Sequence, residues 1–142
     1  MVQINWTIEG EKQLSRRLTK LGKNVEDFRP EFRKSTRFLK GFFGREVFIS
    51  RGSMIGERWK TRKRSYGWPI LERSGKMRKG FRDRTEKLSG EVWNAVDYFK
   101  YHQSNMPRRV LPRRVMMKLT DRLKNKIVSI FHEGLWKRVD RT

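Results

Sequence analysis

The stretch that decides the fold covers residues 74–114 and reads SGKMRKGFRDRTEKLSGEVWNAVDYFKYHQSNMPRRVLPRR. After Gly75 it has a short segment with two apolar residues, and then a set of apolar and aromatic residues typical of paired strands. These residues are Met77 and Phe81, followed by Leu88, Val92, Trp93, Ala95 and Val96. They predict a β-hairpin whose second strand leads into residues 98–103, and therefore an antiparallel sheet.

A further strand is predicted at residues 2–8, where apolar and polar residues alternate with the period of a half-buried strand. The apolar positions are Val2, Ile4, Trp6 and Ile8, and Gly10 ends the pattern. The leucines at positions 14, 18 and 21 then form one stripe of a short helix, which Gly22 stops.

Residues 27–50 predict a longer helix, because large apolar residues recur there at helical spacing. These residues are Phe28, Phe32, Leu39, Phe43 and Val47, and Pro30 suits the first turn. Gly41 and Gly44 lie inside the pattern. Since a glycine inside a helix costs about 1 kcal/mol relative to alanine, we expect the helix to bend or break there.

A last helix is predicted after Thr120 and Asp121, which can cap it. Its apolar stripe consists of Leu119, Leu123, Ile127 and Ile130, and Gly134 is predicted to stop it. Together these elements predict an α+β fold, in which a small antiparallel sheet packs against two or three helices.

Residues 51–69 show no sustained period and predict a long exposed loop. The range contains three glycines and one proline. A cluster of its basic residues, Arg58, Lys60, Arg62, Lys63 and Arg64, is interleaved with the aromatic residues Trp59, Tyr66 and Trp68. Because a structureless loop of this length is usually functional or disordered, we expect it to contact a partner.

Composition favours one domain over residues 1–142 and a highly charged partner. Hydrophobic residues make up only 35% of the chain and charged residues 36%, so much of the chain is expected to be solvated or engaged with a partner. Lys and Arg number 36 against 15 Asp and Glu, a net charge of +21. This charge repels itself unless nucleic acid, an acidic protein or counterions neutralise it.

Four short signatures follow one another between Ser74 and Arg114, with Trp59 and the Ile70-Leu71 pair upstream. They are Ser74-Gly75-Lys76-Met77 with Phe81, Val92-Trp93-Asn94, Tyr98-Phe99-Lys100-Tyr101-His102-Gln103, and Leu111-Pro112-Arg113-Arg114. In this succession the chain resembles the virion morphogenesis family of tailed bacteriophages. The chain departs from the family at two places. After the tyrosine the family usually has alanine, where this chain has Phe99. After the His-Gln pair the family usually has an aromatic residue and glycine, where this chain has Ser104-Asn105.

Members of that family complete the tail and help to join it to the head, so the resemblance implies a structural virion protein. It further implies a subunit of a homo-oligomeric ring at the head–tail junction, or neck. The implied partners are the head connector and tail proteins, with packaged DNA as a non-specific contact. The expected location is the virion, after assembly in the host cytoplasm.

Catalytic chemistry finds little support in this chain. His102 has no Asp or Glu within four residues, and the carboxylates are scattered singly among basic neighbours. The chain has no cysteine, and its glycines do not have the spacing of a phosphate-binding loop. We therefore expect no enzyme, no cofactor and no metal site.

Membrane association is not expected either. No stretch approaches the roughly 18 consecutive apolar residues of a membrane span. The residues after Met1 also lack the basic and apolar regions of a signal peptide.

Two sets of residues are the candidates for partner contact. The candidates for contact with the DNA backbone or an acidic partner are Arg58, Lys60, Arg62, Lys63, Arg64, Arg108, Arg109, Arg113 and Arg114. The candidate interface aromatics are Trp59, Tyr66 and Trp68, which can stack on bases or anchor a protein interface.

The alternative function is a non-catalytic, basic nucleic-acid-binding protein, which explains the net charge but not the ordered signatures. Stoichiometry separates the two functions. A ring subunit should self-associate, whereas a binding module should be sufficient as a monomer.

Overall fold

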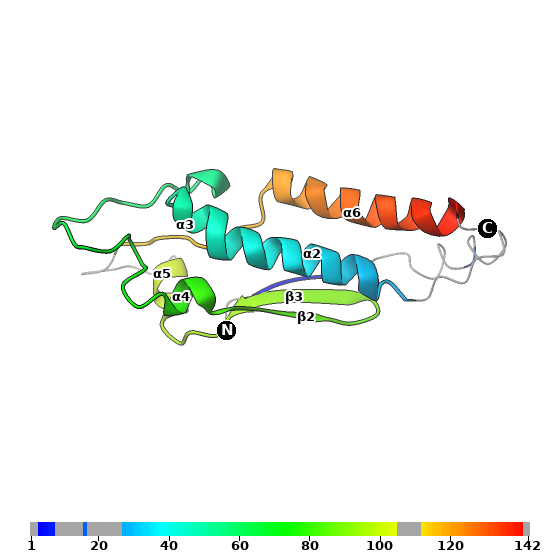
Figure 1. The fold of residues 1–142 in the computed structure, drawn as a ribbon, viewed down its shortest axis with the longest axis horizontal. Coiled ribbons are helices and arrows are strands. Elements are labelled where there is room, and N and C mark those ends of the chain that lie inside the picture. The colour runs from blue at the N-terminus through cyan, green and yellow to red at the C-terminus, as the bar shows by residue number, and fades with distance from the viewer. Residues whose placement is uncertain (1–2, 8–15, 17–26, 105–111, 141–142) are drawn as a thin grey trace.

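A three-stranded antiparallel sheet in the order β1-β3-β2 underlies the fold (Figure 1). Its strands are β1 (Gln3–Thr7), β2 (Phe81–Thr85) and β3 (Ser89–Asn94). In the register, Val92 of the central strand lies opposite Ile4 on one side and Asp83 on the other. The predicted hairpin and antiparallel sheet are therefore confirmed.

The computed structural model describes residues 3–7, 16, 27–104 and 112–140. The statements below concern these residues. Apart from Arg16, the short helix predicted around the leucines at 14, 18 and 21 lies outside them, and so do the candidate residues Arg108 and Arg109.

The long helix predicted from residue 27 is confirmed, including its irregularity at the glycines. Helix α2 (Arg29–Gly41) continues through a π-helical segment, η1 (Phe42–Glu46), into the short helix α3 (Val47–Ile49). A Cβ atom on Gly44 would lie 3.1 Å from the carbonyl oxygen of Arg78, so this glycine allows close approach of the next layer. The π-helical turn falls where Gly41 and Gly44 weaken the regular helix.

Helix α6 (Asp121–Asp140) runs alongside α2 (Figure 1). Its start is as predicted, because the Thr120 hydroxyl accepts a hydrogen bond from the Leu123 amide at 3.3 Å. The prediction that Gly134 ends the helix is wrong. Gly134 faces Glu31 of α2 so closely that a Cβ atom would lie 2.5 Å from the Glu31 Cγ atom, so the glycine serves helix packing.

The remaining elements are short and gather at the end of the molecule away from the hairpin turn (Figure 1). They are the 3₁₀ turn η2 (Ser53–Ile55), α4 (Lys76–Lys79) and α5 (Phe99–Gln103). Phe81 of β2 packs edge-on against Phe99 of α5, with the ring centroids 5.7 Å apart. This contact joins the sheet to the short helices.

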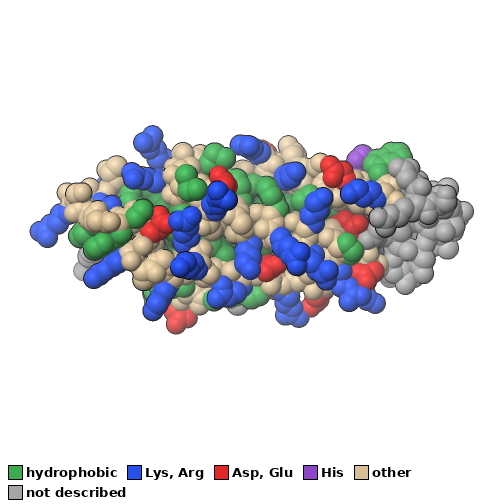
Figure 2. All heavy atoms as spheres, viewed as in Figure 1, with side chains coloured by type: hydrophobic (Ala, Val, Ile, Leu, Met, Phe, Trp, Pro, Cys, Tyr) green, Lys and Arg blue, Asp and Glu red, His purple; other side chains and the backbone are tan. Residues whose placement is uncertain are grey.

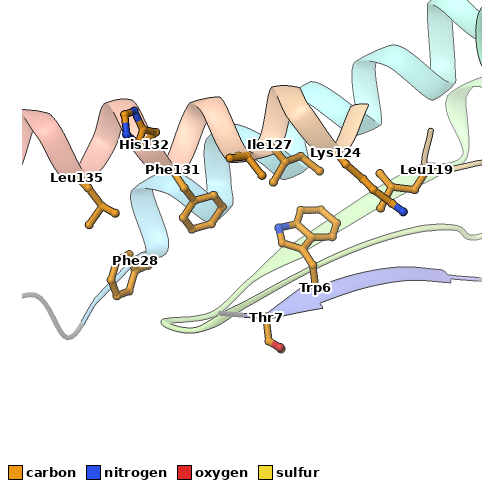
Figure 3. A pocket seen from close by; sticks show the side chains of 10 residues that line it. Trp6, Thr7, Phe28, Leu119, Lys124, Ile127, Phe131, His132 and Leu135 are labelled. Carbon is orange, nitrogen blue, oxygen red and sulfur yellow. The ribbon is translucent and has the colours of Figure 1, made fainter. Parts of the chain in front are cut away.

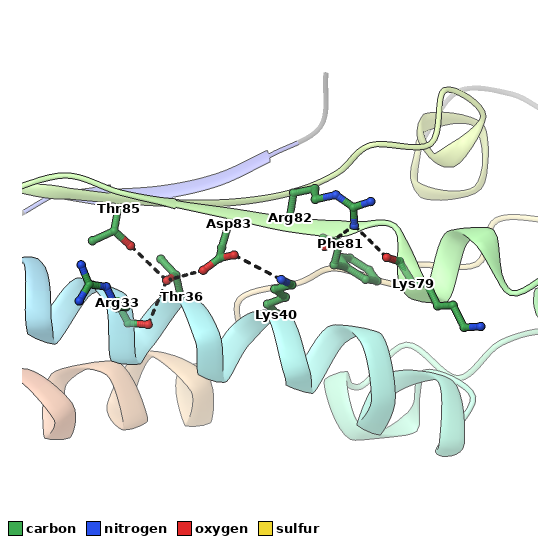
Figure 4. Close-up of polar contacts among 8 residues, drawn as sticks. All are labelled: Arg33, Thr36, Lys40, Lys79, Phe81, Arg82, Asp83 and Thr85. Carbon is green, nitrogen blue, oxygen red and sulfur yellow. Dashed lines mark hydrogen bonds and ion pairs between the residues drawn. The ribbon is translucent and has the colours of Figure 1, made fainter.

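Helix α2 covers the sheet through an apolar core and one polar contact. Phe32 and Leu39 are fully buried on its inner face. Between them, the Thr36 hydroxyl donates to the Asp83 carboxylate at 3.1 Å, and the Lys40 ammonium lies 3.4 Å from the same carboxylate (Figure 4). The helix is thereby fixed over β2 and β3.

A buried extended segment, residues 114–117, runs between α5 and α6 without joining the sheet. Val115, Met116 and Met117 are all buried. The Gln103 side-chain carbonyl accepts hydrogen bonds from the amides of Met116 at 2.9 Å and Met117 at 3.2 Å, and its NH₂ group donates to the Met117 carbonyl. The Gln103 side chain thus pairs with backbone groups of Met116 and Met117 that a neighbouring strand would otherwise pair with.

Replacing Gln103 by methionine should therefore destabilise the fold strongly. The two amides would lose their acceptor, and each buried unpaired amide costs about 1–3 kcal/mol, so we expect a loss of roughly 2–6 kcal/mol. The measurement is chemical denaturation, with Lys100→Met on the exposed face of the same helix as the control. Similar stabilities for the two variants would contradict the assigned role of the amide.

Candidate functional site

The range predicted as a long exposed loop divides into two parts. Its first part packs on the core: Gly52 and Ile55 are buried, and Trp59 is only 4% exposed. The Trp59 indole donates to the Val115 carbonyl at 2.7 Å and packs edge-on against Phe48. Residues 60–69 form the exposed part, in which Arg62 and Trp68 are half-buried.

The prediction of Trp59 as an exposed interface aromatic is therefore wrong. In the sequence, a tryptophan that lies beside basic residues and in a region without hydrophobic periodicity looks like an exposed anchor for a partner. In the structure, the buried segment 114–117 offers its indole both an acceptor and an apolar surface. The apolar run Val115-Met116-Met117 is the signal in the sequence for the core segment that contacts Trp59.

Residues of the exposed part meet α4, the start of α5 and Arg114 around an open pocket of about 390 Å³. We call it the arginine–aromatic pocket. It is lined by Arg62, Tyr66, Trp68, Ile70, Leu71, Arg73, Ser74, Met77, Tyr98 and Arg114. The pocket brings together four of the predicted contact residues, and adds Arg73 and Tyr98, which the sequence candidates omitted.

A turn after Trp68 arranges the aromatic wall of the pocket. Ile70 is buried and anchors the turn, Leu71 takes the left-handed conformation with φ 63°, and the Glu72 amide donates to the Pro69 carbonyl at 3.1 Å. This reversal returns the chain so that Arg73 lies over the Trp68 ring, with its guanidinium carbon 5.2 Å from the ring centroid.

Tyr66 and Trp68 stack on each other with their ring centroids 5.0 Å apart and the planes inclined by 24°. Arg62 lies over the Tyr66 ring at 5.3 Å, as Arg73 does over Trp68. The four side chains form one stacked group, in which each arginine is held by a cation–π contact. Such contacts leave the N–H edges of the guanidinium groups free to donate.

Arg114 forms the floor of the pocket and is only 7% exposed. Its guanidinium donates to the Lys60 carbonyl at 2.8 Å and 3.1 Å, which ties the exposed part of the loop to the buried segment. Burial lowers the pKa of Arg114, and the nearby charge of Arg62 lowers it further. Positive charge is therefore concentrated here at some electrostatic cost.

The other predicted basic residues do not line this pocket. Arg58, Lys60, Lys63 and Arg64 are exposed on the loop, and the Arg113 side chain donates to the Gln103 carbonyl at 3.3 Å. Lys and Arg side chains are spread over the described part of the face seen in Figure 2, with fewer Asp and Glu between them. This spread suits neutralisation of a polyanion rather than the reading of a sequence.

A second surface feature is an apolar groove of about 550 Å³ between β1 and α6 (Figure 3). Trp6 rises from the edge strand toward Ile127 and Phe131 of the helix. Lys124 and His132 are the only described residues lining the groove that can carry charge. His132 also accepts a hydrogen bond from the Trp136 indole at 3.3 Å.

Comparisons with protein-family models, curated proteins and solved structures gave no match. In the described part of the chain, no helix has the length and apolar character needed to cross a bilayer. The same residues contain no cluster of three His, Cys, Asp or Glu side chains suited to a metal ion.

The two tryptophans of the loop should respond differently to truncation. Trp59→Ala should cost about 3–5 kcal/mol of folding free energy, as for other buried aromatic residues. Trp68→Ala, which removes a half-buried stacked ring, should cost about 1 kcal/mol or less. Denaturant titrations of both variants measure this contrast, and equal losses would contradict the division of the loop into a core part and an exposed part.

Proposed function

We propose that this chain is a structural virion protein of a tailed bacteriophage, a tail-completion or head–tail joining subunit that acts in a homo-oligomeric ring. On this proposal it is not an enzyme. Its partners are further copies of itself, the head connector and the tail proteins, and its place is the neck of the particle.

The observation that carries the proposal is that the four signatures contact one another. The Asn94 side chain donates to the Met77 carbonyl at 2.7 Å, which joins the second signature to the first. The Arg114 amide donates to the His102 carbonyl at 2.9 Å, which joins the fourth to the third. Phe81 of the first signature packs against Phe99 of the third with the ring centroids 5.7 Å apart, which links the two pairs. Residues that resemble the phage family in sequence thus build one structural unit, which supports reading them as a fold signature rather than as chance matches.

The surface also has what a ring subunit requires. Two copies of a chain with charge +21 repel each other, so self-association is favoured where the surface carries least charge. On α6, Val128 lines the apolar groove and is 64% exposed, and Trp136, one turn after His132, is 55% exposed. We place the contact with the neighbouring copy on this face of α6.

Val128→Glu tests this contact. Val128 is too exposed for the change to unfold the chain, but a charge at a subunit contact should convert the oligomer into a monomer. Ile49→Glu on α3, where the side chain is 62% exposed, is the matched control and should leave the oligomer intact. Light scattering coupled to gel filtration measures the mass, and a purified chain that is monomeric at all concentrations would contradict the ring.

The role in the particle is tested by removing the gene product during infection. DNA synthesis and head filling should continue, while filled heads and tails accumulate separately because their joining surface is missing. Electron microscopy of the lysate measures this outcome. Joined particles made without the protein would contradict the proposal and leave the basic nucleic-acid-binding protein as the better account, with the arginine–aromatic pocket as its main support.

A further inference from the structure

The arginine–aromatic pocket holds positive charge that the described residues do not balance. Arg62, Arg73 and Arg114 line it, and none of the described residues lining it is acidic. Three carboxylates lie near lining residues in sequence: Glu72 pairs with Arg78 at 2.5 Å, Glu57 pairs with Lys118 at 2.9 Å, and Asp97, beside Tyr98, is exposed and does not line the pocket.

Arg114 makes the imbalance costly. A buried arginine normally has a carboxylate or another anion as partner, because carbonyl hydrogen bonds do not cancel its charge, and only 7% of the Arg114 residue is exposed. Arg114 has the Lys60 carbonyl and, among the ion pairs of the described residues, no carboxylate. The missing counter-charge is the feature that points to an anionic ligand.

The stacked side chains indicate how that ligand is held. Tyr66 and Trp68 each have another ring and a guanidinium as neighbours. The groups left to bind a ligand are the N–H edges of Arg62 and Arg73, whose fork geometry matches two oxygens of a phosphate. Arg114 adds its charge and its Nη1 group, because its Nε and Nη2 groups already donate to the Lys60 carbonyl.

We propose that the arginine–aromatic pocket binds phosphate groups of the DNA backbone through Arg62, Arg73 and Arg114. Three guanidinium groups around one opening match a ligand with closely spaced charges, and duplex DNA carries one charge per about 1.7 Å of its axis. An isolated carboxylate of a protein partner would balance only one of them. Binding is independent of base sequence, because the phosphates are the same at every base pair.

This inference deepens the proposed function and rests on it only for where DNA would meet the pocket, at the neck of the particle. Phosphate binding is measured on the free chain, whereas the proposed function is tested on particles and on oligomer mass. Either can therefore fail without the other.

The experiment compares two double variants with the same loss of charge. Arg62→Gln with Arg73→Gln alters the pocket, and Arg33→Gln with Arg37→Gln removes two exposed arginines from α2. Arg114 is left unchanged because it also ties the loop to the core. Affinity for a short duplex DNA is measured by fluorescence anisotropy over a salt series, with circular dichroism as the check on folding.

The pocket variant should bind at least tenfold more weakly, and the slope of log affinity against log salt should fall by about 1 for each phosphate that is no longer neutralised. The control variant should change both values much less. Equal losses in the two variants would overturn the proposal, since binding would then follow net charge alone. Polyglutamate that binds the unaltered chain as tightly as DNA, and loses affinity in the pocket variant, would overturn it in favour of an acidic protein partner.

A second measurement needs no variant. The arginine Nε–Hε signals of the isotope-labelled chain should include a small set, those of the pocket, that shift first as duplex DNA is added. Pocket signals that stay unchanged at saturating DNA would overturn the proposal even if the double variant proved unfolded.

Discussion

The structure depends on how the buried segment 114–117 satisfies its backbone hydrogen bonds. A peptide group buried without a partner costs about as much as a missing hydrogen bond, and this segment has no neighbouring strand. Its partners come instead from two places in the chain: the Trp59 indole of the loop, and the His102 carbonyl and Gln103 side chain at the end of α5. Because the loop and α5 lie far apart in the chain, satisfying one short segment fixes the positions of the loop, of α5 and of the start of α6.

The same constraint places the arginine–aromatic pocket. Arg114 is the first residue of the buried segment, and its guanidinium donates to the Lys60 carbonyl. Lys60 directly follows Trp59, whose indole is buried in the core. The exposed part of the loop therefore starts from a fixed point. It returns at Ile70, which is buried again, so residues 60–69 are anchored at both ends. A long irregular segment can then present a defined group of stacked side chains without belonging to a helix or strand.

Periodic elements could be predicted from the sequence, whereas contacts between a side chain and a distant backbone could not. The alternation around Ile4 and the helical spacing of Phe28, Phe32 and Leu39 report which face is buried, and the structure agrees. The prediction for Gly134 failed because a glycine that ends a helix and one that admits a neighbouring helix look the same in sequence. The prediction for Trp59 failed because its burial depends on Val115, 56 residues away. For the pocket, the basic and aromatic character of residues 58–68 was visible in the sequence. The sequence did not show that Arg73 and Arg114 meet Tyr66 and Trp68 in one pocket, because that arrangement depends on the turn at Leu71.

Charge explains why such a pocket would be kept in a chain that already carries +21. Burial and the nearby charge of Arg62 lower the pKa of Arg114, so both disfavour its charged form in the free chain. Any anion that binds the folded chain and not the unfolded one offsets this cost by mass action. On the proposed function, the subunit would then be most stable in the particle, where polyanionic DNA is concentrated. On that proposal, an unbalanced arginine site would couple the stability of the subunit to its place of assembly, and a neutralised one could not do so.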